Sequence, residues 1–314
     1  MKALNSYILP RNGYNIFNAG AFLNEIQFGG IVMVKIISDS TCDLSQELLK
    51  RYDIDIIPLH IVKGEEELED GPQIDIRALY EWADANKTTP KTSAPSIETA
   101  MQIMSPYINE GREIICFSIS GEMSTSGNVI RMAAEELEAE EKVTIIDSRN
   151  LSTGIGLLVI EAAIIAAKGS SRDEIEKRIV ELIPKVRASF VVDTLVYLHR
   201  GGRCGAASAL IGGALALHPM IVVKDGKMDA SKKYRGKIGK VIKNYAKDLE
   251  DDMKNALPDR VFITHSECDA EIVNDVREYI ASLGVFEEIL ETRAGGVISS
   301  HCGPGTMGVL FISK

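Results

Sequence analysis

The pattern of hydrophobic and polar positions changes near residue 33. Residues 1–32 mix Asn, Gly, Pro and aromatic residues without a helical or strand period. They contain no apolar run long enough for the core of a signal peptide. From Met33 onward, short apolar runs alternate with amphipathic stretches. We therefore expect the folded part to begin at residue 33, with residues 1–32 forming a leader or a loose tail.

The first half of the folded part alternates between strand and helix patterns. Apolar runs predict strands at 34–38, 54–62, 113–120 and 143–146. Amphipathic stretches predict helices at 45–52, 75–86 and 128–138. This alternation predicts an α/β fold with a mainly parallel sheet that is covered by helices on both faces.

The second half continues the alternation and predicts a second α/β domain. Strands are expected at 190–192, 220–223, 260–264, 288–292 and 309–312, with helices at 171–182, 238–255 and 270–283. Asp225-Gly226 predicts a hairpin turn. Residues 154–167 form a very apolar helix that is too short to cross a bilayer, so we expect it to be buried between layers or between domains. We place the domains at 33–160 and 161–314.

Two stretches rich in hydroxyl side chains precede predicted helices. In the first, at 91–96, Ser93 is the expected N-cap because Pro95 fits only the first turn of a helix. The second spans 118–127 and follows a predicted strand. Loops after the carboxyl ends of parallel strands meet at one sheet edge, and helix starts favour anions. The candidate ligands of one carboxylate or phosphate are Thr92, Ser93, Ser124 and Ser126. The alternative is two unrelated helix caps.

His301 stands in a stretch rich in Gly, which leaves its ring accessible. If protonated, it would add the positive charge that the hydroxyl side chains lack. A second interpretation is a serine hydrolase, with Ser124 as nucleophile, His301 as base, and Asp39 or Asp147 orienting the base. The G-x-S-x-G sequence of a nucleophile elbow is absent, so we keep this interpretation as the alternative.

Composition and motifs exclude several other classes of function. A formal net charge of −10 disfavours nucleic acid and anionic membranes as partners. Gly303–Gly308 matches G-x-G-x-x-G, but a strand rather than a helix is expected after it, and no Walker A sequence is present. The five cysteines lie far apart and the histidines lack metal-ligand spacing. We therefore expect no cofactor, no metal, no stable membrane insertion and a reducing cytoplasmic setting.

A local basic cluster contrasts with the acidic chain. It consists of Lys224, Lys227, Lys232, Lys233, Arg235, Lys237, Lys240 and Lys243. A solvated strand and helix face explains such a cluster most simply. The alternative is a docking face for a partner that handles phosphate, for which Arg235 is the best suited residue.

Five short motifs, in this order, resemble those of the DegV family. They are Asp39–Leu44, Thr92–Ser96, Met123-Ser124, Gly201–Arg203 and His301–Gly305. The resemblance runs from about Met33 to the C-terminus. It implies a two-domain α/β protein that is not an enzyme and that holds one long-chain fatty acid, such as palmitate, in an apolar tunnel.

The resemblance also implies roles for single residues. Thr92 or Ser93 and Ser124 would hold the fatty acid carboxylate, with His301 completing the hydrogen-bond network. Arg235 matches the position linked to work with a kinase, since bacterial relatives serve as the acyl-binding subunit of a fatty acid kinase. Transport of lipid, or presentation of it for phosphorylation by a partner, is the expected function.

Overall fold

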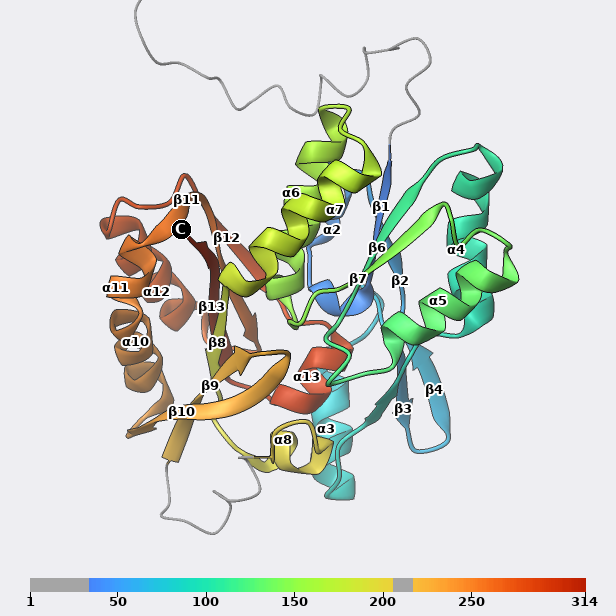
Figure 1. The fold of residues 1–314 in the computed structure, drawn as a ribbon. Helices are drawn as coiled ribbons and strands as arrows, with labels where there is room; N and C mark the ends of the chain where they lie inside the picture. Colours follow the sequence, from blue (N-terminus) through green and yellow to red (C-terminus); the bar gives the residue numbers. More distant parts are fainter. Residues whose placement is uncertain (1–33, 206–216) are drawn as a thin grey trace, which may run out of the picture. The chain divides into compact units, whose positions relative to one another are not determined.

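Three sheets organise the part of the chain that the structure describes. The computed structural model describes residues 34–205 and 217–314. The expected leader at 1–32 and residues 206–216 of the apolar stretch before β9 lie outside the described residues (Figure 1).

The first sheet is fully parallel and has the strand order β2-β1-β6-β7. Its strands are β1 (Lys35–Asp39), β2 (Ile54–Ile57), β6 (Ile114–Ser118) and β7 (Val143–Asp147). The helices of this half are α2 (Gln46–Arg51), α3 (Ile76–Asn86), α4 (Ile97–Asn109) and α5 (Ser126–Glu136), with a 3₁₀ turn η2 (Ser40–Cys42) after β1. This sheet confirms the parallel α/β fold that the alternation predicted.

A small antiparallel sheet, with order β4-β3-β5, lies next in the chain. Its strands are β3 (His60–Lys63), β4 (Glu66–Glu69) and β5 (Lys91–Ser93). The single strand expected at 54–62 is thus divided between two sheets, with Pro58 at the break because it has no backbone N–H to donate. Ser93 ends β5 and is not the N-cap of α4. That cap is Ser96, whose hydroxyl accepts from the Thr99 N–H, so the expectation for Ser93 was wrong.

The large sheet of the second half has the order β10-β9-β8-β13-β11-β12. Its strands are β8 (Val186–Val191), β9 (Leu217–Lys224), β10 (Lys227–Arg235), β11 (Ala256–Ser266), β12 (Glu288–Arg293) and β13 (Thr306–Ser313). The β11–β12 pair is parallel and the other pairs are antiparallel. The predicted Asp225-Gly226 turn is confirmed, since both residues have positive φ and join β9 to β10.

The remaining helices pack on these sheets. They are α6 (Thr153–Ala167), α7 (Arg172–Leu182), α8 (Val196–Gly201), α10 (Ile238–Asp248), α11 (Glu250–Lys254), α12 (Ala270–Ser282) and α13 (Gly296–Cys302), with a 3₁₀ turn η3 (Ile183–Lys185) after α7. The helix expected at 238–255 is two helices, α10 and α11. No helix within the described ranges is long and apolar enough to span a bilayer.

The apolar helix α6 is central to the core. Ile155 and Leu158 belong to one buried cluster with Phe117 of the parallel sheet and with Phe190 and Leu310 of the large sheet. A helix that is apolar all round must be covered on all sides, so α6 lies between layers, as its sequence predicted. In Figure 1, α4 and α5 cover the other face of the parallel sheet, and α10, α11 and α12 cover the other face of the large sheet.

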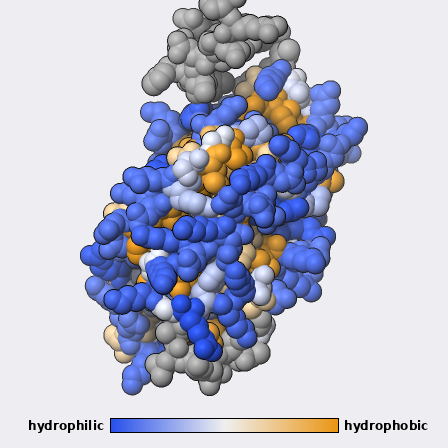
Figure 2. Space-filling view, turned by 90° about the vertical axis from the view of Figure 1, so that its left-hand side faces the viewer, coloured by the Kyte–Doolittle hydropathy of each residue, from blue (hydrophilic) through white to orange (hydrophobic). Residues whose placement is uncertain are grey.

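The face drawn in Figure 2 is mostly hydrophilic, with apolar atoms in small separate patches. Among the described residues, the large apolar side chains that are exposed are Met132, Val180 and Val196. Scattered exposure of this kind is ordinary for a protein surface.

Candidate functional site

The parallel sheet has a switch point between β1 and β6. The chain runs from β1 to β2 on one side, while β6 and β7 continue on the other. Ligands of open α/β sheets bind outside the carboxyl ends of the strands at such a point. The loop that follows β6 carries Ser124, and Asp39 ends β1.

A cavity of about 490 Å³ lies at this edge. Thr92 and Ser93 reach it from β5, Ser124 from the loop after β6, and His301 from α13. The Thr92 Oγ1 atom lies 2.8 Å from His301 Nε2. Ser124 Oγ accepts a hydrogen bond from the Ser126 N–H at 3.2 Å, which fixes its side chain at the start of α5. Four of the five candidate ligand residues therefore share one cavity.

Ser126 is placed differently. Its side chain is fully buried and its hydroxyl donates to Asp39 Oδ2 at 2.8 Å. The same Asp39 oxygen accepts the Ile119 N–H at 2.8 Å. Because Asp39 holds both ends of the loop that carries Ser124, Ser126 fixes the shape of this loop and does not line the cavity.

His301 is the second-last residue of α13 and not part of a turn. Burial, with a smaller contribution from the Arg203 guanidinium, lowers the pKa of His301 to about 4. A neutral imidazole is therefore expected near neutral pH, so His301 would serve as a neutral hydrogen-bond donor and not as a source of positive charge. Arg203 lines the same cavity and brings that charge instead. In the sequence, Arg203 belongs to the motif Gly201–Arg203, but the sequence analysis gave no role to its side chain.

The imidazole of His301 lies against the end of α8. A Cβ atom on Gly201 would lie 2.2 Å from His301 Nδ1, so only glycine leaves room for the ring there. Among the described residues, Nδ1 has no hydrogen-bond partner. A buried N–H without an acceptor costs more than an unpaired lone pair, so we infer that the proton is on Nε2. Nε2 then donates to Thr92 Oγ1, and the Thr92 hydroxyl keeps its own proton for a ligand oxygen.

The hydrolase arrangement is not formed. The contact of His301 Nε2 is with Thr92, while Nδ1 has no carboxylate to orient it. Asp39 accepts from Ser126, Thr41 and Ile119, and Asp147 accepts from backbone N–H groups of Gly121 and Arg149. Neither carboxylate has a hydrogen bond or ion pair with the imidazole, so the structure does not favour the triad of the alternative interpretation.

A small apolar space lies next to the cavity. Its volume is about 30 Å³, and it shares Leu151, Ile298 and Cys302 with the cavity. Farther along, Phe190 and Leu310 line it from the large sheet. Its hydroxyl side chains are all paired with other protein groups, as seen for Ser152, Ser189, Thr264, Ser266 and Thr306. The walls therefore leave no hydroxyl without a partner.

Buried carboxylates hold the start of α13. Asp43 Oδ1 accepts the Gly295 N–H and Asp70 Oδ1 accepts the Gly296 N–H, both at 2.8 Å. Burial raises the pKa of Asp43 to about 8 and that of Asp70 to about 6, although these hydrogen bonds act in the opposite direction. Sequence analysis missed both residues, because their partners lie more than 200 positions away in the chain.

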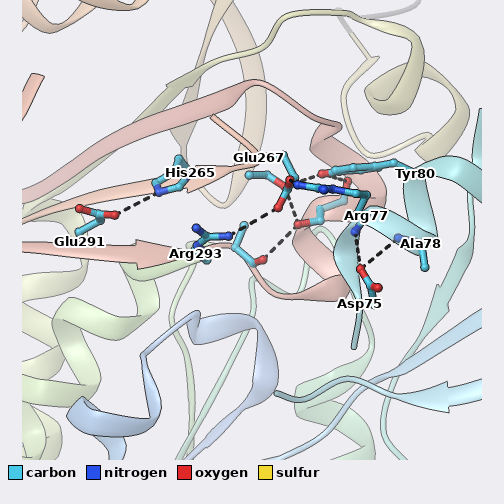
Figure 3. A network of polar contacts seen from close by, with 11 residues as sticks. Asp75, Arg77, Ala78, Tyr80, His265, Glu267, Glu291 and Arg293 are labelled. Atoms are coloured by element: carbon cyan, nitrogen blue, oxygen red, sulfur yellow. Dashed lines mark hydrogen bonds and ion pairs between the residues drawn. The ribbon is translucent and has the colours of Figure 1, made fainter. Parts of the chain in front are cut away.

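A second polar network joins α3 to the large sheet (Figure 3). Glu267 pairs with Arg77 of α3 at 3.2 Å and with Arg293 of β12 at 3.6 Å. Tyr80 of α3 shares a hydrogen bond with Ser266. The network thus holds α3 against the end of β11. Within residues 34–205 and 217–314, no three His, Cys, Asp or Glu side chains are grouped so that they could hold a metal ion.

The fold and the cavity define an α/β protein with a cavity at the switch point of its parallel sheet and a small apolar space beside that cavity. The chain belongs to the DegV family: the family model described as "Uncharacterised protein, DegV family" matches residues 33–314. A DegV domain-containing protein of Clostridium perfringens is 30% identical over 281 residues, covering 90% of this chain and 99% of the relative. One from Deinococcus radiodurans is 32% identical over 276 residues, covering 88% and 97%.

Solved structures are similar over the same part of the chain. A DegV family protein from Thermus thermophilus, described by its fatty acid binding, matches with a TM-score of 0.82 and 28% identity. The match covers 90% of this chain and all of that one. A stearic-acid-binding protein from Eubacterium ventriosum matches with a TM-score of 0.78 and 29% identity, covering 90% and 99%.

Proposed function

We propose that this protein binds one long-chain fatty acid, with the carboxylate in the cavity beside Thr92, Ser124 and His301. The observation that carries the proposal is the shared cavity of these side chains together with the small apolar space next to it. The fatty acids bound by the Thermus and Eubacterium proteins support the same class of ligand. The five cysteines are all free, which suits a reducing cytoplasmic setting.

The head group would be held mainly by neutral donors. The Thr92 hydroxyl, with His301 Nε2 behind it, donates to one carboxylate oxygen, and the Ser124 hydroxyl donates to the other. Ser93 lies beside Thr92 at the cavity edge as a further donor. Arg203 faces the same space and offsets the charge of the carboxylate. This arrangement orients the carboxylate and leaves most of the affinity to the tail.

The tail would run past Leu151, Ile298 and Cys302 toward Phe190 and Leu310. Each buried methylene contributes about 0.8 kcal/mol, so a long tail supplies on the order of 10 kcal/mol before ordering costs. A space of about 30 Å³ is roughly the share of one water molecule, so the tail must displace side chains to enter. The apolar stretch at residues 206–217 is a further candidate wall for the tail, but it lies outside the described residues except for Leu217.

Bound lipid gives the direct test. Lipid extracted from the protein after mild purification should contain a straight-chain acid of about C14–C18. The resemblance to the DegV family implies this range, and burial of methylenes favours such lengths over short acids. Mass spectrometry identifies the acid, and titration of delipidated protein with palmitate should show one site. Absence of any acid, together with absence of palmitate binding, would refute the proposed function.

We propose further that a separate kinase phosphorylates the bound acid. The carboxylate oxygen would attack the terminal phosphate of ATP held by the kinase, forming an acyl phosphate and releasing ADP. The lack of a Walker A sequence in this chain supports a nucleotide site on the partner. Arg235 is exposed at the end of β10, whose residue Met228 lines the cavity. At about 3.4 Å per residue, Arg235 is roughly 24 Å farther along the strand than Met228, too far to touch the carboxylate.

Arg235→Ala is therefore expected to leave palmitate affinity unchanged and to lower acyl phosphate formation with the kinase by about tenfold or more, because a charge-assisted contact is lost. Affinity is measured by titration, and acyl phosphate by its hydroxamate. Arg131→Ala, which removes an exposed arginine from α5, is the control and should change neither value. Weaker palmitate binding by Arg235→Ala would overturn the assignment.

A further inference from the structure

Helix α13 is held at both ends by residues of the small sheet. At its start, the Gly296 N–H donates to Asp70 Oδ1 at 2.8 Å, and Asp70 directly follows β4. At its end, His301 Nε2 lies 2.8 Å from Thr92 Oγ1 on β5. Asp43, which follows η2, accepts the Gly295 N–H at 2.8 Å. The geometry of the His301–Thr92 contact thus depends on where the start of α13 is fixed.

The two carboxylates are themselves fixed by other parts of the chain. Ser40 Oγ donates to Asp70 Oδ2 at 2.8 Å and accepts the Leu59 N–H at 3.1 Å. Ser152 Oγ donates to Asp43 Oδ2 at 2.5 Å. Asp70 is 3% exposed and Asp43 is 6% exposed. Buried aspartate side chains whose two oxygens are both hydrogen-bonded cannot swing freely, so they define one position for the backbone that they bind.

The position of the helix is set by contacts with the rest of the protein, which also include a hydrogen bond of 2.8 Å between Ser299 Oγ and Ser266 Oγ in its middle. The helix is 7 residues long, too short to be stable by its own hydrogen bonds. Its first residue is a glycine that packs closely: a Cβ on Gly296 would lie 2.4 Å from Ile61 Cδ1 and 3.0 Å from Asp70 Oδ1. Val297 follows in a small buried cluster with Leu59 and Ile61. Any change at this end is therefore passed along a short rigid element to His301.

We propose that Asp70, assisted by Asp43, is a positioning residue for the head group: through α13 it sets the place where His301 meets Thr92 and the ligand carboxylate. The proposal deepens the fatty acid site proposed above and rests on it. Neither aspartate is among the residues that touch the ligand in that proposal. Their effect on affinity must therefore pass through His301, and this requirement can be measured.

The test is a double-mutant cycle between Asp70→Ala and His301→Ala, read as palmitate affinity. Asp70→Ala should weaken binding about tenfold in the otherwise unchanged protein and less than about twofold when His301 is already replaced. Asp70→Asn should restore binding to within about threefold, because its amide oxygen can still accept the Gly296 N–H. Equal losses in both backgrounds would show that Asp70 does not act through His301 and would overturn the proposal.

Glu267→Gln is the control for removing an acidic side chain nearby. Glu267 pairs with Arg77 of α3 and Arg293 of β12, both of which lie outside α13 (Figure 3). The Glu267→Gln substitution should leave the affinity for palmitate unchanged. If Asp70→Ala does not fold, Gly296→Ala takes its place in the cycle, since its Cβ displaces the start of α13 while Asp70 remains.

A second measurement separates this proposal from the proposed function. NMR of protein labelled with nitrogen isotopes at histidine should show His301 in the Nε2–H form without lipid, and Asp70→Ala should shift that signal while Glu267→Gln should not. Failure of the unchanged protein to bind palmitate would refute the function alone. An unshifted His301 signal in Asp70→Ala would refute the positioning role alone.

Discussion

Thr92→Val is expected to weaken palmitate binding by roughly 10–100-fold while the fold is retained. Valine has nearly the shape of threonine, so packing at β5 changes little. The substitution removes the donor to the carboxylate and also the partner of His301 Nε2. A hydrogen bond to a charged group contributes about 1.5–3 kcal/mol, which sets this range.

Affinity is measured by titration of delipidated protein, and folding by circular dichroism and thermal unfolding. Thr88→Val is the matched control, because Thr88 is exposed and lies outside the cavity. It should bind palmitate as the unchanged protein does. Equal affinities of Thr92→Val and Thr88→Val would contradict the placement of the carboxylate at Thr92.

The parallel half of the fold could be predicted from sequence because its signals are local. Strand, helix and loop each occupy a continuous segment, and βαβ units leave few alternatives for the sheet order. The apolar sequence of α6 likewise predicted burial between layers, which the structure confirms. The division of residues 54–62 was missed because β3 leaves the parallel sheet to pair with β5, about thirty positions later in the chain. Single-sequence patterns carry no information on such pairing.

The lack of information on contacts between distant segments also explains the errors at the site. Lys91–Ser93 became a strand through its pairing with β3, so the cap fell to Ser96. His301 lies on a helix whose start is held by Asp43 and Asp70, far earlier in the chain. Its neutral state follows from burial, which a sequence does not show. The sequence could supply a set of four hydroxyl residues near one sheet edge together with His301, and four of these five candidate residues line the cavity.

The largest expected effect concerns the tail. Cys302 borders both the cavity and the small apolar space next to it and is 4% exposed. Cys302→Leu adds bulk at this passage and should close it, so that acids longer than the outer cavity can no longer bury their tails. If about six methylenes lose their burial, at about 0.8 kcal/mol each, palmitate affinity falls by on the order of a thousandfold. Overpacking should lower stability by only about 1–3 kcal/mol.

A series of straight-chain acids from octanoic to hexadecanoic acid shows whether the passage is the one that the tail uses. In the unchanged protein each added methylene should strengthen binding by up to about fourfold, less the cost of widening the space. Cys302→Ala leaves the passage open and should keep that slope. Cys302→Leu should bind the shortest acids nearly as well and then show no further gain with length. If the affinity of Cys302→Leu rises with chain length up to hexadecanoic acid as it does in the unchanged protein, the tail takes another path. That result would not contradict the placement of the carboxylate at Thr92.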